Sequence, residues 1–400
     1  MSRRLNPRVY LVKESPTRAI DRIRLKLKAE NKDIIMLSAG QPSIPPPSWA
    51  IEEFAAEIKK RTMSTFGYTP TRGLPDVISA ILLELSANGL NLSEKEVALT
   101  GGGQNALFSV LSTILEPGDP VAVLDPLYFG YWPLLDYLDL RPIRIPTLME
   151  NGFQPDTARI EAALASGARA VILVTPDNPT GRLLSEKTLR EITELAIDYE
   201  AWLVVDEAYR SLVYEGEHVY AYKLAPDRTI AVNTLSKDPG MPGWRLGFVY
   251  GPEEVISRIV MVVQETIYCP PLPAQLLAKI YYSNRKGRKE HLNYIVRTYR
   301  ARRDSLMRAL KEYVPESKFH TPEGGMFLFA DFSSLLPEKI TSDELAVKLL
   351  QSKGVATVPG SFFSTRYTKA LRLSFVSETP ERLEEAARRI SEALDELQRK

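Results

Sequence analysis

The sequence predicts an α/β protein in which a mostly parallel sheet carries helices on both faces, followed by a smaller α+β domain. Short apolar runs rich in Val and Ile are typical of buried strands; they cover 121–125, 170–175, 202–207, 229–234 and 246–251. Stretches between these runs, such as 185–200 with Ser185 as a candidate cap, have helical spacing. After about residue 285 the pattern changes to a long charged helix over 287–312, then short strands and helices. The alternating strands and helices predict the α/β part, and the change of pattern after residue 285 predicts the α+β domain.

The length of 400 residues exceeds what one simple core needs, so we expect more than one domain. The predicted parts are an N-terminal segment over 1–45 that packs on the small domain, a large domain over 46–285 and a small C-terminal domain over 286–400. Open α/β sheets bind ligands at the carboxyl ends of their strands, so we expect the site there.

Composition excludes several classes of function. The 51 basic and 50 acidic residues give a net charge of +1, which does not build the basic field that nucleic acid binding needs. One cysteine and three scattered histidines predict no internal disulfide and no metal site. No run approaches the roughly 20 apolar residues of a membrane span, and the N-terminus lacks a signal peptide. We therefore expect a soluble cytoplasmic protein without nucleic acid or membrane partners.

A glycine triplet, Gly101 to Gly103, precedes Gln104 and a segment whose apolar helical spacing starts at Ala106. Backbone N–H groups at the start of a helix form an anion site when no side chains block them. A plain glycine-rich turn explains the triplet equally well. The pattern matches neither the dinucleotide fingerprint GxGxxG nor a P-loop, so a dinucleotide fold is poorly supported.

Two predicted strands end in polar side chains. Asn178 lies between Asp177 and Pro179 directly after one strand, and a proline turn there holds the amide at the sheet edge. Asp206 ends another strand and is followed by Tyr209. A carboxylate in that position is costly unless a cation meets it. The structural alternatives are an Asx turn for Asn178 and a helix cap for Asp206.

The stretch "NTLSKDPGMPGWRLGFVYG" (233–251) brings Thr234 and Lys237 to a strand end, and Arg245 to the start of the next strand. A desolvated lysine becomes a nucleophile that forms a Schiff base, and an arginine suits a phosphate. Alone, Lys237 would be an ordinary loop lysine. Together with the glycines, the amide and the carboxylate, these groups match what pyridoxal 5′-phosphate (PLP) requires.

The sequence resembles the class I/II aminotransferases of PLP fold type I, the aspartate aminotransferase superfamily. The resemblance runs over nearly the whole chain in the family's order, through "SAGQPS", "FGYTPTRGLPDV", "GGGQNAL", "DPLYFGY", "PDNPTG", "DEAY", "SK…GWRLG" and "LRLSF". It implies a three-layer large domain with a mixed, mostly parallel sheet. It also implies transfer of an amino group between an L-amino acid and a 2-oxo acid in two half-reactions, through a Schiff base on Lys237.

The resemblance assigns roles residue by residue. Lys237 would hold PLP and move the proton, Asp206 would pair with the ring nitrogen, and Asn178 and Tyr209 would bind the ring's phenolic oxygen. The remaining roles are the phosphate site (Gly102, Gly103, Gln104, Thr234, Arg245), stacking on the ring (Tyr128) and the substrate carboxylate (Arg372, with Gly40 and Asn178). Tyr68 would reach the phosphate of the neighbouring subunit, which implies a homodimer.

The sequence also departs from the family's pattern. Thr234 stands where serine is frequent, and the glycine at 102 offers no side-chain contact to the phosphate. No arginine lies between Arg258 and Arg285, which weakens a pure aspartate specificity. The amino acid used stays open. A lyase, synthase or oxidase on the same scaffold is an alternative, and a PLP-fold sensor without catalysis is a third.

Overall fold

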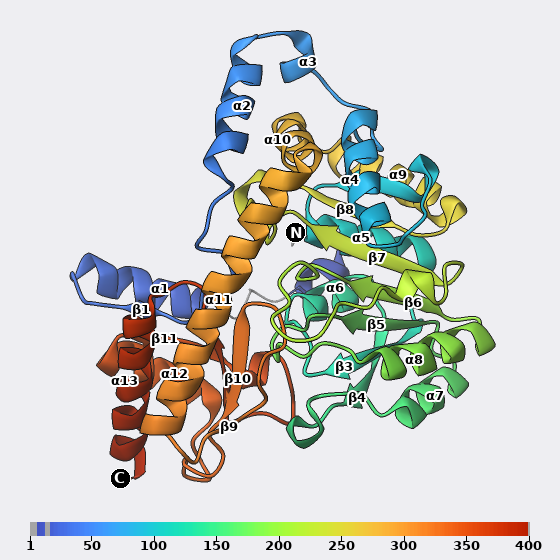
Figure 1. The fold of residues 1–400 in the computed structure, drawn as a ribbon. Helices are drawn as coiled ribbons and strands as arrows, with labels where there is room; N and C mark the ends of the chain where they lie inside the picture. The colour runs from blue at the N-terminus through green and yellow to red at the C-terminus, as the bar shows by residue number, and fades with distance from the viewer. Residues whose placement is uncertain (1–5, 13–16, 399–400) are drawn as a thin grey trace, which may run out of the picture.

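The computed structural model describes residues 6–12 and 17–398. Figure 1 shows a large sheet and a smaller one, and the long helix α11 (Arg285–Tyr313), which runs diagonally from α10 down past the smaller sheet.

The larger sheet has seven strands in the order β2-β8-β7-β6-β5-β3-β4. β8 pairs antiparallel with both of its neighbours, and the other pairs are parallel. The predicted mixed, mostly parallel sheet is confirmed. The strands are β2 (Val97–Thr100), β3 (Pro120–Asp125), β4 (Arg141–Pro146), β5 (Ala170–Val174), β6 (Trp202–Asp206), β7 (Thr229–Thr234) and β8 (Gly247–Tyr250).

Alternate residues of these strands face opposite layers, because strand side chains have a period of two. Val121 and Val123 of β3 belong to a core shared with α5 (Gly103–Ile114), α6 (Tyr131–Tyr137) and α9 (Glu253–Ile267). Ala122 and Leu124 belong to a second core shared with α7 (Thr157–Ala165) and α8 (Glu186–Asp198). A third core covers the β2–β8 edge with α4 (Pro75–Ala87) and α10 (Leu272–Ser283), and contacts α2 (Ser48–Lys59). The result is the three-layer arrangement that the sequence predicts.

The smaller sheet has four antiparallel strands in the order β12-β13-β10-β9. They are β9 (Lys318–Phe319), β10 (Phe327–Asp331), β12 (Val358–Pro359) and β13 (Ala370–Ser374). α11, α12 (Ser342–Lys348) and α13 (Pro380–Gln398) supply its core partners. β1 (Ile35–Met36) pairs with β11 (Val355–Ala356), and α1 (Thr17–Ala29) contacts residues 349–353. The domain boundaries themselves stay a prediction.

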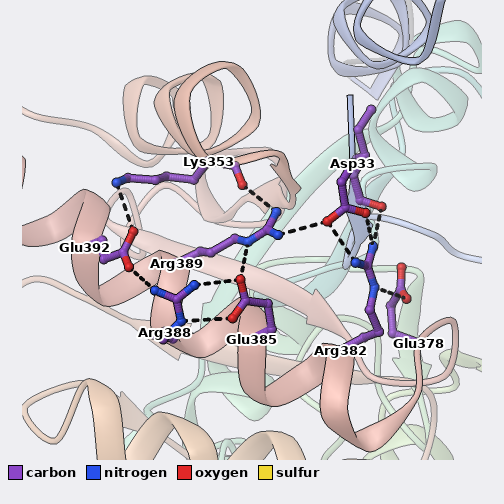
Figure 2. A network of polar contacts seen from close by, with 9 residues as sticks. Asp33, Lys353, Glu378, Arg382, Glu385, Arg388, Arg389 and Glu392 are labelled. Carbon is purple, nitrogen blue, oxygen red and sulfur yellow. Dashed lines mark hydrogen bonds and ion pairs between the residues drawn. The ribbon is translucent and has the colours of Figure 1, made fainter. Parts of the chain in front are cut away.

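A surface network of charges fastens the segment before β1 to α13 (Figure 2). Asp33 accepts hydrogen bonds from Arg382 and Arg389, each at 2.8 Å. Glu378 accepts the backbone N–H of Met36 at 2.7 Å. Because β1 leads directly into Ser38 and Gly40, this network fixes where those two residues lie.

Two strands of the larger sheet were not predicted. β4 carries Pro142, Pro146 and two arginines, which an edge strand tolerates because only one side needs backbone partners. β2 is apolar and buried, but it has only four residues and directly precedes the glycine triplet. In residues 6–12 and 17–398, no helix is long and apolar enough to cross a membrane.

Candidate active site

A cavity of about 640 Å³ lies at the carboxyl ends of β5, β6 and β7, and both sheets contribute to its lining. The structure thus gathers predicted residues from widely separated parts of the chain. Those that line the cavity are Gly40, Gly103, Gln104, Tyr128, Asn178, Asp206, Tyr209, Thr234, Lys237, Arg245 and Arg372.

Lys237 lies in the turn after β7 and is half-buried. Its Nζ donates to the carbonyl oxygen of Gly40 at 2.6 Å and lies 5.6 Å from the centre of the Tyr209 ring. Burial and the nearby Arg372 guanidinium lower the pKa of the Lys237 amine to about 8. A substantial neutral fraction therefore exists at mildly alkaline pH, as a nucleophilic amine requires.

Asp206 ends β6 and is buried. One carboxylate oxygen accepts the backbone N–H of Ala208 at 3.0 Å, and the other accepts the hydroxyl of Tyr131 at 3.2 Å. Burial raises the pKa of Asp206 to about 6, against the effect of these hydrogen bonds and of Lys237. The Asp206 carboxylate therefore lines the cavity, where the Lys237 ammonium attracts it electrostatically. Sequence reasoning missed Tyr131, whose signal was only one aromatic residue among several in "DPLYFGYW".

The N-terminus of α5 forms a cradle with Thr234 and Arg245. Gly102 has φ +89°, and a Cβ atom there would lie 2.8 Å from Arg245 Nη2. A Cβ atom at Gly103 would lie 3.4 Å from Thr234 Cβ. Free helix N–H groups, a hydroxyl and a guanidinium thus converge, which is the donor set that a phosphate needs.

Arg372 on β13 is a buried cation. Its Nη1 donates to Asn178 Oδ1 and its Nη2 to the Ser38 carbonyl, both at 3.1 Å. Its Nε is buried without a hydrogen-bond partner, and no carboxylate of the described residues forms an ion pair with it. Burial lowers its pKa to about 10. A buried guanidinium without an anion fits the carboxylate of a substrate.

Asn178 is held by a turn that is itself tied by a buried ion pair. Arg182 Nη2 lies 3.6 Å from Asp177 Oδ1, and Thr180 Oγ1 donates to Asp177 Oδ2 at 2.5 Å.

Tyr209 is buried nearby, and burial raises the pKa of its phenol far above the ordinary value, so the phenol stays a hydrogen-bond donor.

Tyr68 lies outside this cavity. Its side chain follows α3 (Met63–Phe66), is 86% exposed and packs edge-on against Tyr268 at 5.1 Å between ring centres. Conversely, sequence reasoning missed Ile20 and Arg24 of α1, which line the cavity, because the N-terminal helix had no visible connection to either sheet.

The family described as "Aminotransferase class I and II" matches residues 32–390. The chain belongs to this family. This aminotransferase is 33% identical over 395 residues to a probable aspartate/prephenate aminotransferase of Thermus aquaticus, with 98% of this chain and 100% of the relative covered. It is 30% identical to an aspartate aminotransferase of Thermotoga maritima, with 97% and 98% covered.

Solved structures of aspartate aminotransferases also resemble this chain. A double mutant of Thermus thermophilus aspartate aminotransferase superposes with a TM-score of 0.91 at 31% identity, covering 98% of this aminotransferase and 100% of that chain. The same enzyme with maleate gives the same values. This chain is therefore a PLP-dependent aminotransferase, and the lyase, synthase or oxidase alternative is not favoured.

The residues present fit PLP. The cradle at α5 suits its phosphate, the buried Asp206 suits a protonated ring nitrogen, and Lys237 Nζ suits its aldehyde. Asn178 and Tyr209, whose side chains are hydrogen-bonded to each other, supply donors for the ring oxygen.

Proposed function

We propose that this enzyme moves an amino group between an L-amino acid and a 2-oxo acid in two half-reactions, with Lys237 as the reactive amine. The observation that carries this proposal is one cavity that the Lys237 amine, the buried Asp206 carboxylate and the Arg372 guanidinium all line, with both charged groups close enough to act on the pKa of the amine.

The cofactor would be held at five points. Lys237 would hold it covalently as a Schiff base, and Asp206 would bind its ring nitrogen. Asn178 and Tyr209 would donate to its ring oxygen, and Tyr128 would lie against its ring. The phosphate site would comprise the backbone N–H groups of Gly102, Gly103 and Gln104 with the side chains of Thr234 and Arg245. When bound, PLP supplies a ring that stabilises negative charge at the substrate Cα.

Lys237 would also move the proton. Its neutral amine, with a pKa of about 8, would accept the proton from the substrate Cα and deliver it to the C4′ carbon of the bound cofactor, because that pKa lies near the working pH. Asp206, with a pKa of about 6, is ionised at neutral pH and therefore able to pair with a cationic ring nitrogen.

Substrate orientation would depend on Arg372. Its guanidinium is fixed by Asn178 and Ser38, stacks on Phe327 at 4.0 Å and keeps a free Nε donor, so a bound carboxylate has one position. That position fixes Cα relative to Lys237 Nζ, which converts binding energy into orientation.

We further propose that the preferred substrate is acidic. Among the described residues, the cavity lining includes a fourth cation, Arg24 of α1, beside Lys237, Arg245 and Arg372. Arg24 would bind a second carboxylate in this cavity, whose lining also includes the apolar side chains of Phe129 and Val358. The names of the relatives, aspartate aminotransferase among them, support this choice.

The enzyme is further proposed to be a cytoplasmic homodimer that serves amino acid biosynthesis. α2 and α3 project at the top of Figure 1. α3 carries the exposed side chains of Met63 and Phe66, and the exposed Tyr68 follows it two residues later. A second copy packed on this surface would bring Tyr68 to the neighbouring phosphate site. The single cysteine, Cys269, suits a reducing compartment.

Borohydride reduction tests the proposal. Purified enzyme mixed with PLP and reduced should carry the added mass on the peptide that contains Lys237. Lys237→Ala should lose both the label and transamination, whereas Lys279→Ala, which removes an exposed lysine, should keep both. A label on another lysine, or full activity of Lys237→Ala, would refute the proposal.

A further inference from the structure

A buried ion pair lies directly beside the cavity, on the residue that follows Lys237. Asp238 is 6% exposed; its Oδ2 accepts from Arg288 Nη2 at 2.8 Å and its Oδ1 from the Tyr281 hydroxyl at 2.6 Å. Arg288 is 7% exposed and lies in the first turn of α11. Within the part of the chain that the structure describes, neither charged residue lines the cavity.

The Asp238–Arg288 pair belongs to a continuous network of polar side chains that also includes Glu207, the residue after Asp206. Arg288 Nη1 lies 2.5 Å from Glu84, and Arg210 lies 3.7 Å from the other oxygen of the same carboxylate. Arg210 donates to Asn233 Oδ1 at 2.8 Å, and Asn233 donates to Glu207 at 3.1 Å. One buried network therefore holds both Asp238 and Glu207, the residues that follow Lys237 and Asp206.

α11 also contacts the loop that supplies the hydrogen-bond acceptor of the lysine amine. The hydroxyl of Tyr299, which is fully buried in α11, accepts the backbone N–H groups of Ser43 and Ile44 at 3.1 and 3.3 Å. This loop begins with Gly40, whose carbonyl accepts from Lys237 Nζ. The same helix thus fixes the backbone from which Lys237 departs and the loop on which its amine rests.

We propose that Arg288 is a positioning residue for Lys237 and acts through Asp238. It holds the lysine turn in place, and it neutralises the carboxylate that follows the lysine. This inference rests on the proposed role of Lys237. A buried ion pair is weak support for stability by itself, because desolvation offsets its attraction, so its position beside the reactive amine is the informative feature.

The proposal makes an electrostatic prediction of definite sign. Without Arg288, the Asp238 carboxylate lacks its cation and favours the protonated form of the Lys237 amine, whereas a neutral residue at 238 disfavours it. The charged or titratable groups around Asp238 are Arg288 and His291 of α11, Tyr281 and Tyr282 of α10, Arg210 after β6, and Glu84 of α4. Those around Lys237 are Arg372, Asp206, Arg245 and Tyr209.

The test titrates the apoprotein, so it does not depend on activity. Trinitrobenzenesulfonate reacts with neutral amines, and mass spectrometry of the Lys237 peptide at pH 6 to 10 gives the midpoint of its reactivity, with exposed Lys279 as internal reference. The wild-type midpoint should lie near 8. It should rise in Arg288→Met, fall in Asp238→Asn and stay near wild type in Arg288→Lys, which retains the charge.

Arg303→Met is the matched control. Arg303 is a buried arginine of the same helix that pairs with Glu215 at 3.0 Å, outside the network described here. Its loss should leave the Lys237 midpoint unchanged. In the loaded enzyme, Arg288→Met should lower kcat about tenfold with little change in KM, since misplacing a reactive group slows the chemical step.

Wild-type midpoints in both Arg288→Met and Asp238→Asn, or the same shift in Arg303→Met, would overturn the positioning role. If Arg288→Met does not fold, Asp238→Asn decides alone: a lower midpoint supports the role and an unchanged one removes it. Failure of the proposed function looks different, because the wild-type holoenzyme would then lack the borohydride label on Lys237.

Discussion

Asp206→Asn should stabilise the cofactor-free protein while it removes activity. Burial raises the pKa of Asp206 from 3.8 to about 6, and each pKa unit corresponds to about 1.4 kcal/mol. The ionised carboxylate therefore costs the folded apoprotein about 3 kcal/mol at neutral pH. Asparagine has nearly the same shape, keeps an oxygen for the Ala208 N–H and has no charge to desolvate.

The pH dependence has a definite sign. The folded state binds this proton more tightly than the unfolded state, so the contribution of Asp206 is fully present below about pH 4 and is lost as pH rises through about 6. The gap in Tm between variant and wild type should open over that window and then level off. For 400 residues, about 3 kcal/mol corresponds to about 4 °C.

Differential scanning fluorimetry of both apoproteins from pH 4 to 8 measures the gap. Arg303→Met provides a comparison of opposite sign: Arg303 lowers the pKa of Glu215, so its loss should destabilise the protein above about pH 4.5, whereas Asp206→Asn should stabilise it. A gap that is constant with pH, or a variant less stable than wild type at pH 7.5, would refute the reasoning about Asp206.

Three further substitutions test other parts of the site. Arg372→Leu should raise KM for every amino acid by about 100-fold or more, because truncating one partner of a buried charge pair costs roughly 3 kcal/mol or more; an unchanged KM in steady-state assays would contradict its role. Gly102→Ala should weaken PLP binding at least about tenfold in a fluorescence titration, since the new Cβ would lie 2.8 Å from Arg245 Nη2 at a position with φ +89°, and equal affinity would show that the cradle adapts. Arg24→Leu should raise KM for aspartate about tenfold and leave KM for alanine unchanged; Arg22→Leu on the same helix is the control, and parallel losses for both substrates would remove the proposed acidic preference.

Much of the fold could be predicted because its central strands are buried on both faces. β5, β6 and β7 appear in the sequence as continuous apolar runs, and the polar residues at their ends, Asn178, Asp206 and Lys237, line one cavity. Ser185 also caps α8 as predicted, by accepting the N–H of Thr188.

The rest depends on contacts that no local pattern encodes. Tyr131 reaches Asp206 from α6, and Ser38 reaches Arg372 from a segment 334 positions away. Arg288 lies in a stretch, "RKGRKEH", whose charge pattern is typical of a solvated helix face, yet it is buried by packing against α10 and α4. Pattern reasoning fails there because burial of one residue in a charged turn is decided by tertiary neighbours.

The carbonyls of Ser38 and Gly40 have one more consequence. These two residues contribute to the wall of the active-site cavity. They lie on a segment that precedes every strand of the larger sheet and that surface ion pairs hold at Asp33. A protease that cut the exposed stretch at residues 30–33 would leave every central strand intact, yet it would loosen the segment whose carbonyls accept from a lysine and an arginine. Inactivation would then come well before unfolding.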